Sequence, residues 1–104
     1  MNVQFESYAI NYLGGQSTTN KRGAYIYCFS GTTLVGRLQF FMNAADVAKN
    51  DYTGNIVTLS FHISQFQDVL HVLEYEKPLY LFFNSGDGRI GTWDQEPVGE
   101  QEGV

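Results

Sequence analysis

The stretch from Asn55 to Asn84 decides the fold, and it reads NIVTLSFHISQFQDVLHVLEYEKPLYLFFN. From Ile56 to Ile63, apolar and polar residues alternate, which is the period of a strand with one buried face. From Leu79 to Phe83 the chain is apolar on both faces, as is typical of a strand in the interior of a sheet. We therefore predict two strands, one on each side of the segment between them.

A helix is predicted in that middle segment. Ser64 and Gln67 have the spacing of a capping box, so the helix is expected to start there. Pro78 disfavours helical geometry in the residue before it and predicts a helix end near Tyr75 or Glu76. About a dozen residues separate the two strands, enough for a right-handed parallel crossover, and we predict a βαβ unit. The apolar face of the helix, at i, i+3, i+4 and i+7, consists of Phe66, Val69, Leu70 and Leu73.

Three other signals describe the remaining strands. Ala24–Phe29 and Thr33–Met42 flank a tight connection and predict a hairpin. Near the N-terminus the alternation slips by one residue at Glu6-Ser7, which predicts either a β-bulge or two short strands. Gly86-Asp87-Gly88 favours a hairpin turn over a calcium loop, because the ligand spacing of an EF-hand is absent.

The predicted fold is α+β, with about six strands in one mixed, mainly antiparallel sheet and one amphipathic helix on one face. The helix is placed at residues 65–75. A length of 104 residues is that of one domain. We predict a single globular domain at residues 1–93, followed by an acidic C-terminal tail at residues 94–104.

Charge and composition exclude several classes of partner. The net charge is −5, and residues 94–104 hold four acidic residues and no basic one, so the rest of the chain is nearly neutral. Without a basic stripe, the usual electrostatic source of nucleic-acid binding is missing, and no nucleic-acid partner is predicted. No apolar run approaches the roughly 20 residues of a membrane span, so no membrane partner is predicted. One cysteine and no signal-peptide pattern predict a cytoplasmic location.

Few residues are candidates for catalysis. Cys28, His62 and His71 are the only thiol and imidazole groups of the chain. The predicted elements direct them to different faces, and a buried cysteine is commonly a small hydrophobic residue. We therefore predict no catalytic residue, no metal and no cofactor. An enzyme that uses Cys28 or a histidine is the least favoured class of function.

Aromatic residues make up 15% of the chain, more than one modest core readily hides. One helix covers one face of the predicted sheet, so aromatic side chains on the second face need another cover, and the candidates are the loop at residues 43–55, a second copy of the chain or a ligand. We predict a non-catalytic interaction module that forms a homodimer through this face, because a closed two-fold buries the same patch on both copies. The alternative is a small apolar or aromatic ligand in an aromatic-lined pocket. The predicted interface or ligand-binding residues are Tyr25, Tyr27, Phe29, Tyr80, Phe82 and Trp93.

Parts of the chain resemble a group of small bacterial proteins. Lys77–Asn84, followed by Glu96–Glu102, is similar to the end of small uncharacterised bacterial proteins found in environmental and mobile-cassette genes. Ala24–Phe41 resembles them as well. The resemblance implies a compact stand-alone bacterial domain that can form an oligomer. It implies no reaction, and no functional residue is carried over from it.

Overall fold

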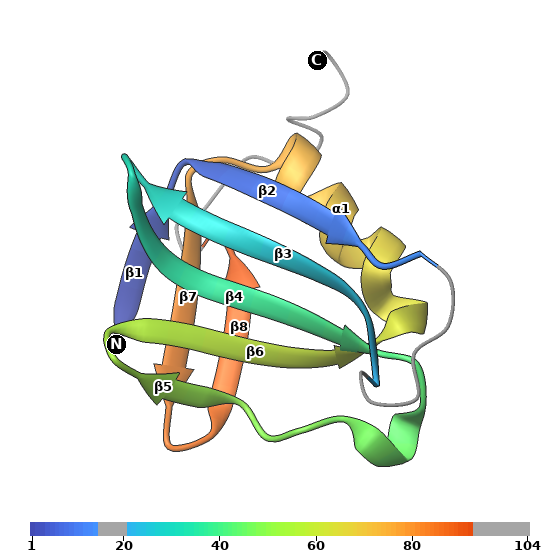
Figure 1. Cartoon of the computed structure of the whole chain (residues 1–104). Helices are drawn as coiled ribbons and strands as arrows, with labels where there is room; N and C mark the ends of the chain where they lie inside the picture. Colours follow the sequence, from blue (N-terminus) through green and yellow to red (C-terminus); the bar gives the residue numbers. More distant parts are fainter. Residues whose placement is uncertain (15–20, 93–104) are drawn as a thin grey trace.

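In the part of the chain that the structure describes, the strands form two sheets, whereas the sequence predicts one (Figure 1). A computed structural model describes residues 1–14 and 21–92 of the chain. Within them, the smaller sheet has the order β1-β7-β8, and the larger sheet has the order β2-β3-β4-β6-β5. The bounds are β1 Asn2–Phe5, β2 Ser7–Tyr12, β3 Arg22–Ser30, β4 Thr33–Phe41, β5 Asp51–Thr53, β6 Ile56–His62, β7 Leu79–Asn84 and β8 Asp87–Gly91.

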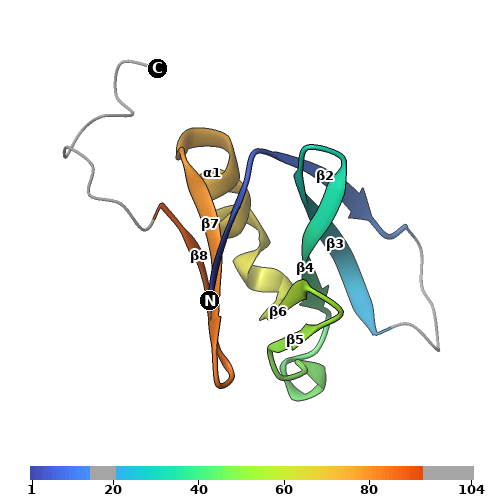
Figure 2. The same ribbon diagram turned by 90° about the vertical axis from the view of Figure 1, so that its left-hand side faces the viewer.

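The sheets and the helix pack in two layers. Figure 2 shows the larger sheet on one side, with the smaller sheet and helix α1 (Phe66–Tyr75) on the other. The α+β class is confirmed, and so is the single amphipathic helix against one face of a sheet. The single sheet of about six strands is wrong. The physical reason is that β7 pairs antiparallel with β1 and β8, and therefore builds a second sheet.

The N-terminal segment belongs to both sheets. Strand β1 pairs with β7 in the smaller sheet, and β2 pairs with β3 in the larger sheet, both antiparallel. Between them, the Glu6 N–H donates to the Phe29 carbonyl at 3.0 Å. Of the two alternatives for the slip at Glu6-Ser7, the structure shows two short strands. The parity changes there because Phe5 faces the core from one sheet and Tyr8 from the other.

The parallel pair of this fold is β4 with β6. The predicted parallel crossover through the helix is wrong, because β6 and β7 lie in different sheets. Residues 42–55 connect β4 to β6 and are long enough for a parallel crossover. This connection contains a 3₁₀ turn at Ala44–Asp46 and strand β5. The sequence pattern allows at most one or two helical turns at Ala44–Lys49 and does not predict the strand. Gly54 and Asn55 form the tight turn from β5 into β6, both with positive φ.

Both predicted hairpins are present. Strands β3 and β4 pair antiparallel across the turn that precedes Thr33. Strands β7 and β8 pair across a turn formed by Ser85 and Gly86, whose φ angles are +50° and +89°. The second turn lies two residues earlier than the Asp87-Gly88 pair indicates, because Asp87 already pairs with Asn84.

Helix α1 ends at Tyr75, as predicted, but its cap differs from the prediction. A 3₁₀ turn, η2 (Ile63–Gln65), precedes the helix, and His62 caps it. The His62 ring accepts from the Ser64 N–H, and the His62 N–H donates to the Gln65 side chain, both at 3.2 Å. His62 still has the extended backbone of an N-cap, whereas Ser64 is already inside the first turn. No helix in the described residues is long and apolar enough to cross a membrane.

His62→Ala should lower the free energy of unfolding by about 1 kcal/mol, because it removes the acceptor that caps the helix start. Chemical denaturation at neutral pH measures the change. His71→Ala is the matched control, since His71 is exposed and lies within the helix, and its loss should stay within about 0.5 kcal/mol. Equal losses in both variants would show that the His62 cap does not stabilise the helix.

The core lies between the two layers. Alternate residues of β3, β4 and β6 form the inner face of the larger sheet and contribute to the core. Helix α1 contributes its apolar stripe from the opposite layer. The smaller sheet adds buried residues of β1 and β7. The buried core residues are Phe5, Ala24, Ile26, Cys28, Leu38, Phe40, Val57, Leu59, Phe66, Val69, Leu73, Leu79 and Leu81.

Candidate functional site

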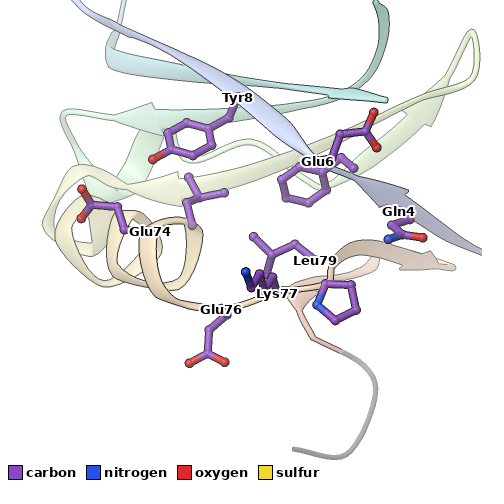
Figure 3. Close-up of a pocket in the computed structure, with 10 residues that line it drawn as sticks. Gln4, Glu6, Tyr8, Glu74, Glu76, Lys77 and Leu79 are labelled. Carbon is purple, nitrogen blue, oxygen red and sulfur yellow. The ribbon is translucent and has the colours of Figure 1, made fainter. Parts of the chain in front are cut away.

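A groove opens where the corner between β1 and β2 meets the end of helix α1 (Figure 3). Its volume is about 660 Å³, a size typical of pockets that bind small molecules. Four parts of the fold build its wall: β1, β2, the last turn of α1 and the segment that leads into β7. The lining residues are Gln4, Phe5, Glu6, Tyr8, Leu73, Glu74, Glu76, Lys77, Pro78 and Leu79.

The floor of the groove is apolar and fixed in place. Phe5 comes from β1, Leu73 from α1 and Leu79 from β7, and their exposed fractions are 3%, 6% and 6%. Phe5 and Leu79 face each other in the β1–β7 ladder. All three residues belong to the hydrophobic core. A ligand in the groove would therefore rest on the outer surface of a packed core, which holds its shape.

The rim of the groove is polar and carries both signs of charge. In Figure 3, Tyr8 and Glu74 stand on one side of the floor, and Glu6 and Gln4 stand on the other. Lys77 lies between these two sides. The Glu6 carboxylate accepts a hydrogen bond from the Gly31 N–H, so it is tied to the turn between β3 and β4. The rim can thus offer hydrogen bonds and ionic contacts around an apolar floor.

The predicted aromatic site residues fall on two different sheets. Those on β3 of the larger sheet are Tyr25, Tyr27 and Phe29, and those on β7 of the smaller sheet are Tyr80 and Phe82. The expectation that they share one sheet face is wrong, because the two sheets pack with their outer faces in opposite directions (Figure 2). Trp93 lies outside the described residues. A role of these side chains in binding stays a prediction.

The aromatic side chains of β3 are partly covered by the chain itself. The rings of Tyr25 and Tyr27 stack, with centroids 5.8 Å apart. The Arg22 guanidinium lies 5.8 Å from the Tyr25 ring centroid and 5.1 Å from that of Phe41. Arg22 Nε donates to Gln39 Oε1 at 2.8 Å, which holds the guanidinium over the rings. Cation–π contacts and ring stacking therefore supply part of the cover that a partner was expected to provide.

Arg37 is a second polar feature of this outer face. It faces Tyr27 in the β3–β4 ladder. In the described part of the chain, Arg37 Nε is the one buried side-chain nitrogen or oxygen without a hydrogen-bond partner. An unmatched buried donor costs about 1–3 kcal/mol.

The thiol and the imidazoles do not form a nucleophilic site. Cys28 is buried in β3, and burial raises the pKa of its thiol from 9.0 to about 12. The reactive thiolate is therefore absent at neutral pH. The Cys28 thiol of the unfolded chain ionises at a lower pH than that of the folded protein. The contribution of the neutral, buried thiol to the free energy of unfolding is therefore lost as the pH rises from about 9 to 12. His62 is engaged in the helix cap, and the ring of His71 packs on Tyr75 with centroids 4.7 Å apart.

Metal ligands do not gather in the described residues. Across residues 1–14 and 21–92, no group of three or more His, Cys, Asp or Glu side chains is placed to hold a metal ion. Glu6 and Glu74 stand on opposite sides of the groove floor (Figure 3).

The comparisons with known proteins return no match. No family model matches the chain, and no curated protein or solved structure matches it. The resemblance to small bacterial proteins of mobile-cassette type stays a prediction, as does the cytoplasmic location. The basis for a function is therefore the geometry of the groove and of the exposed surfaces.

Sequence reasoning missed the groove. Two local signals fall on its walls: the parity slip at Glu6-Ser7 and the proline stop at Pro78. Each signal marks a corner of the chain, and corners leave side chains that neither sheet covers. The two corners lie near opposite ends of the described chain, so nothing in the local pattern shows that they adjoin.

Proposed function

We propose that this protein is a non-catalytic binding module that holds a small organic molecule in the groove of Figure 3. The supporting observation is the groove itself, with a volume of about 660 Å³, an apolar floor and a polar rim. Binding sites for small molecules commonly combine a concave apolar surface with a few polar groups that set the orientation. The floor of Phe5, Leu73 and Leu79 would take the carbon body of the ligand.

The rim favours a cationic group on that ligand. Tyr8 and Glu74 stand on the same side of the floor, so an ammonium group there meets a ring and a carboxylate together. A charge-assisted hydrogen bond to the carboxylate and a cation–π contact to the ring both favour a cation. Glu6 and Glu76 also line the groove, so the lining holds three carboxylates against one ammonium group from Lys77. The proposed ligand class is therefore a small amine with an aromatic or aliphatic body.

A homodimer through the aromatic side chains remains the second candidate. Tyr25, Tyr27 and Phe29 are half-buried on the outer face of the larger sheet, so part of each ring is available to a partner. Arg22 already covers part of this surface. The area left for a partner is thus smaller than the sequence indicates, and we place this candidate after the groove.

An NMR titration tests the groove. Phenethylamine should cause saturable amide shifts at Glu6, Tyr8 and Leu73, while 3-phenylpropanoate, a similar body with a negative charge, should bind more weakly. Glu74→Gln should weaken amine binding about tenfold, because a hydrogen bond to a charged group contributes about 1.5 kcal/mol.

Asp68→Asn is the matched control for the titration. Asp68 is an exposed carboxylate on the same helix and does not line the groove, so this variant should bind phenethylamine as the unchanged protein does. Equal affinity for the amine and the acid would contradict the proposed ligand class. Shifts confined to residues outside the groove would contradict the site.

A further inference from the structure

Strand β2 is an edge of the larger sheet, and among the described residues it pairs with β3 alone (Figure 1). The Leu13 N–H donates to the Gly23 carbonyl at 2.9 Å. Alternate residues of an antiparallel strand direct their backbone groups to the same neighbour, so those of Asn11 also face β3. The backbone N–H and C=O groups of Tyr8, Ile10 and Tyr12 point in the opposite direction, outward from the edge of the sheet.

This edge lacks the features that keep edge strands from pairing. From Ser7 to Tyr12 the sequence has no charged residue, proline or glycine. At the opposite edge, β5 is three residues long and begins with Asp51. In the smaller sheet, edge strand β8 carries an ion pair between Asp87 and Arg89 at 2.9 Å. Short length and charge both oppose the addition of a strand, and β2 has neither.

The side chains along this edge leave apolar surface uncovered. Ile10 points to the inner face of the sheet, because it pairs with the fully buried Ile26. Tyr12 lies on the same face, where its ring meets the Phe66 ring edge-on at 5.4 Å. Helix α1 covers the inner face only up to this rim. Ile10 is therefore 41% exposed and Tyr12 is 65% exposed.

We propose that a second copy of this chain adds its own β2 to this edge, antiparallel to the first, about a two-fold axis midway between the two Ile10 residues. Ile10 then faces Ile10 of the second copy, and Tyr8 faces Tyr12. The outward backbone groups of these residues exchange hydrogen bonds in pairs. Because the axis is perpendicular to the sheet, the inner faces of both copies lie on the same side of one continuous sheet.

The edge is self-complementary, which favours a second copy over an unrelated strand. The outward residues are placed symmetrically about Ile10, so the two-fold gives each outward donor an acceptor. A two-fold contact also pairs two strands of identical sequence, so a charged residue near the axis would lie close to the same charge on the other copy and be repelled by it. Strand β2 has no charge, so this repulsion does not arise. The two Ile10 side chains cover one another on the inner face.

The pairing also brings a residue of the second copy to the groove. Tyr8 lines the groove, and the residue that faces it is Tyr12 of the second copy. Facing side chains in an antiparallel pair have Cβ atoms about 4.5–5.5 Å apart, so the second ring extends the groove wall. This step rests on the proposed function, whereas the contact between the two copies does not.

Sedimentation equilibrium of the full chain at high micromolar concentration tests the contact. The expected mass is twice that of the 11.7 kDa chain. Ile10→Lys places two ammonium groups opposite one another on the axis, and the mass should fall to that of one chain. Met42→Lys changes a side chain that is 54% exposed and lies outside β2, so this control should stay dimeric. A single-chain mass for the unchanged protein, or a dimeric Ile10→Lys variant, overturns the proposal.

A proline variant separates the contact from the fold. The Ile10 N–H points away from β3, so Ile10→Pro keeps the ladder with β3 while it removes a donor on each copy from the contact. The variant should be monomeric with an unchanged far-ultraviolet circular dichroism spectrum. A dimer with that same spectrum would contradict the proposed edge.

Cross-linking gives a readout that does not depend on a disruptive change. Ile10→Cys places two thiols on the axis, and a short bismaleimide should join them into a covalent dimer. Cys28 is buried and should not react. Met42→Cys supplies an exposed thiol away from the axis, and it should give no dimer. Failure of Ile10→Cys to cross-link overturns the contact. Unchanged amine binding by a monomeric variant overturns only the contribution of the second Tyr12 ring to the groove.

Discussion

Phe40→Ala should lower the free energy of unfolding by about 3–5 kcal/mol, the largest loss that we expect from one substitution. Phe40 is fully buried in β4 on the inner face of the larger sheet. Its ring centroid lies 5.3 Å from that of Phe61 and 5.0 Å from that of Phe66. The ring therefore joins the sheet to the first turn of helix α1. Alanine would leave a cavity at this junction and remove both ring contacts.

Urea denaturation measures the loss as a change in midpoint at constant slope. Tyr75→Ala is the control, because Tyr75 is an aromatic residue that is 47% exposed at the end of the helix, and its loss should be well below 1 kcal/mol. Phe40→Leu should fall between the two variants, since it keeps part of the apolar volume. A loss for Phe40→Ala no larger than that of the control would mean that the helix does not depend on this ring.

Local patterns predict the elements of this fold well. The β3–β4 hairpin, the amphipathic helix and its end before Pro78 all depend on neighbours within about ten residues, where period and turn chemistry decide. The start of the helix is less well predicted, because Ser64 and His62 can both accept from backbone N–H groups. The extended backbone of His62 makes it the cap.

Sheet membership could not be predicted in the same way. Leu79–Phe83 reads as an interior strand, and it is one, with β1 and β8 on its two sides. Nothing in its own sequence says which strands those neighbours are. The parity slip at Glu6-Ser7 is the one local sign that the chain changes sheets there. A slip is equally consistent with a bulge in a single sheet, so the sequence alone left both readings open.

The candidate surfaces show the same limit. Aromatic content correctly indicates more rings than the core holds, yet the most exposed large apolar side chains include Ile10 and Tyr12 on the inner-face side of β2. Both pair with buried residues of β3, Ile10 with Ile26 and Tyr12 with Ala24, yet they stay exposed because helix α1 does not cover the edge strand. The extent of that cover depends on how α1 lies across the sheet. A stripe of apolar residues on the helix does not contain that information.

Gly36→Ala should lower the free energy of unfolding by about 1–3 kcal/mol, because it overpacks the space between the two sheets. Gly36 is buried in β4. A Cβ atom added there would overlap Leu81 Cδ1 of β7 and would lie 3.5 Å from the Cys28 Cβ. Leu81 is fully buried, so its side chain has no free space into which to turn. The two sheets can approach closely here because this position has no side chain.

A double-mutant cycle shows whether the contact with Leu81 causes this loss. Leu81→Val removes the Cδ1 atom that the new methyl group would strike, so the combined variant should lose less than the sum of the two single losses. Gly91→Ala is the control, because a Cβ atom at Gly91 has nothing within 4 Å, and its effect should stay within about 0.5 kcal/mol. Strictly additive losses would show that the contact with Leu81 does not cause the destabilisation by Gly36→Ala. The close approach of β4 to β7 would then not be the reason for a glycine at position 36.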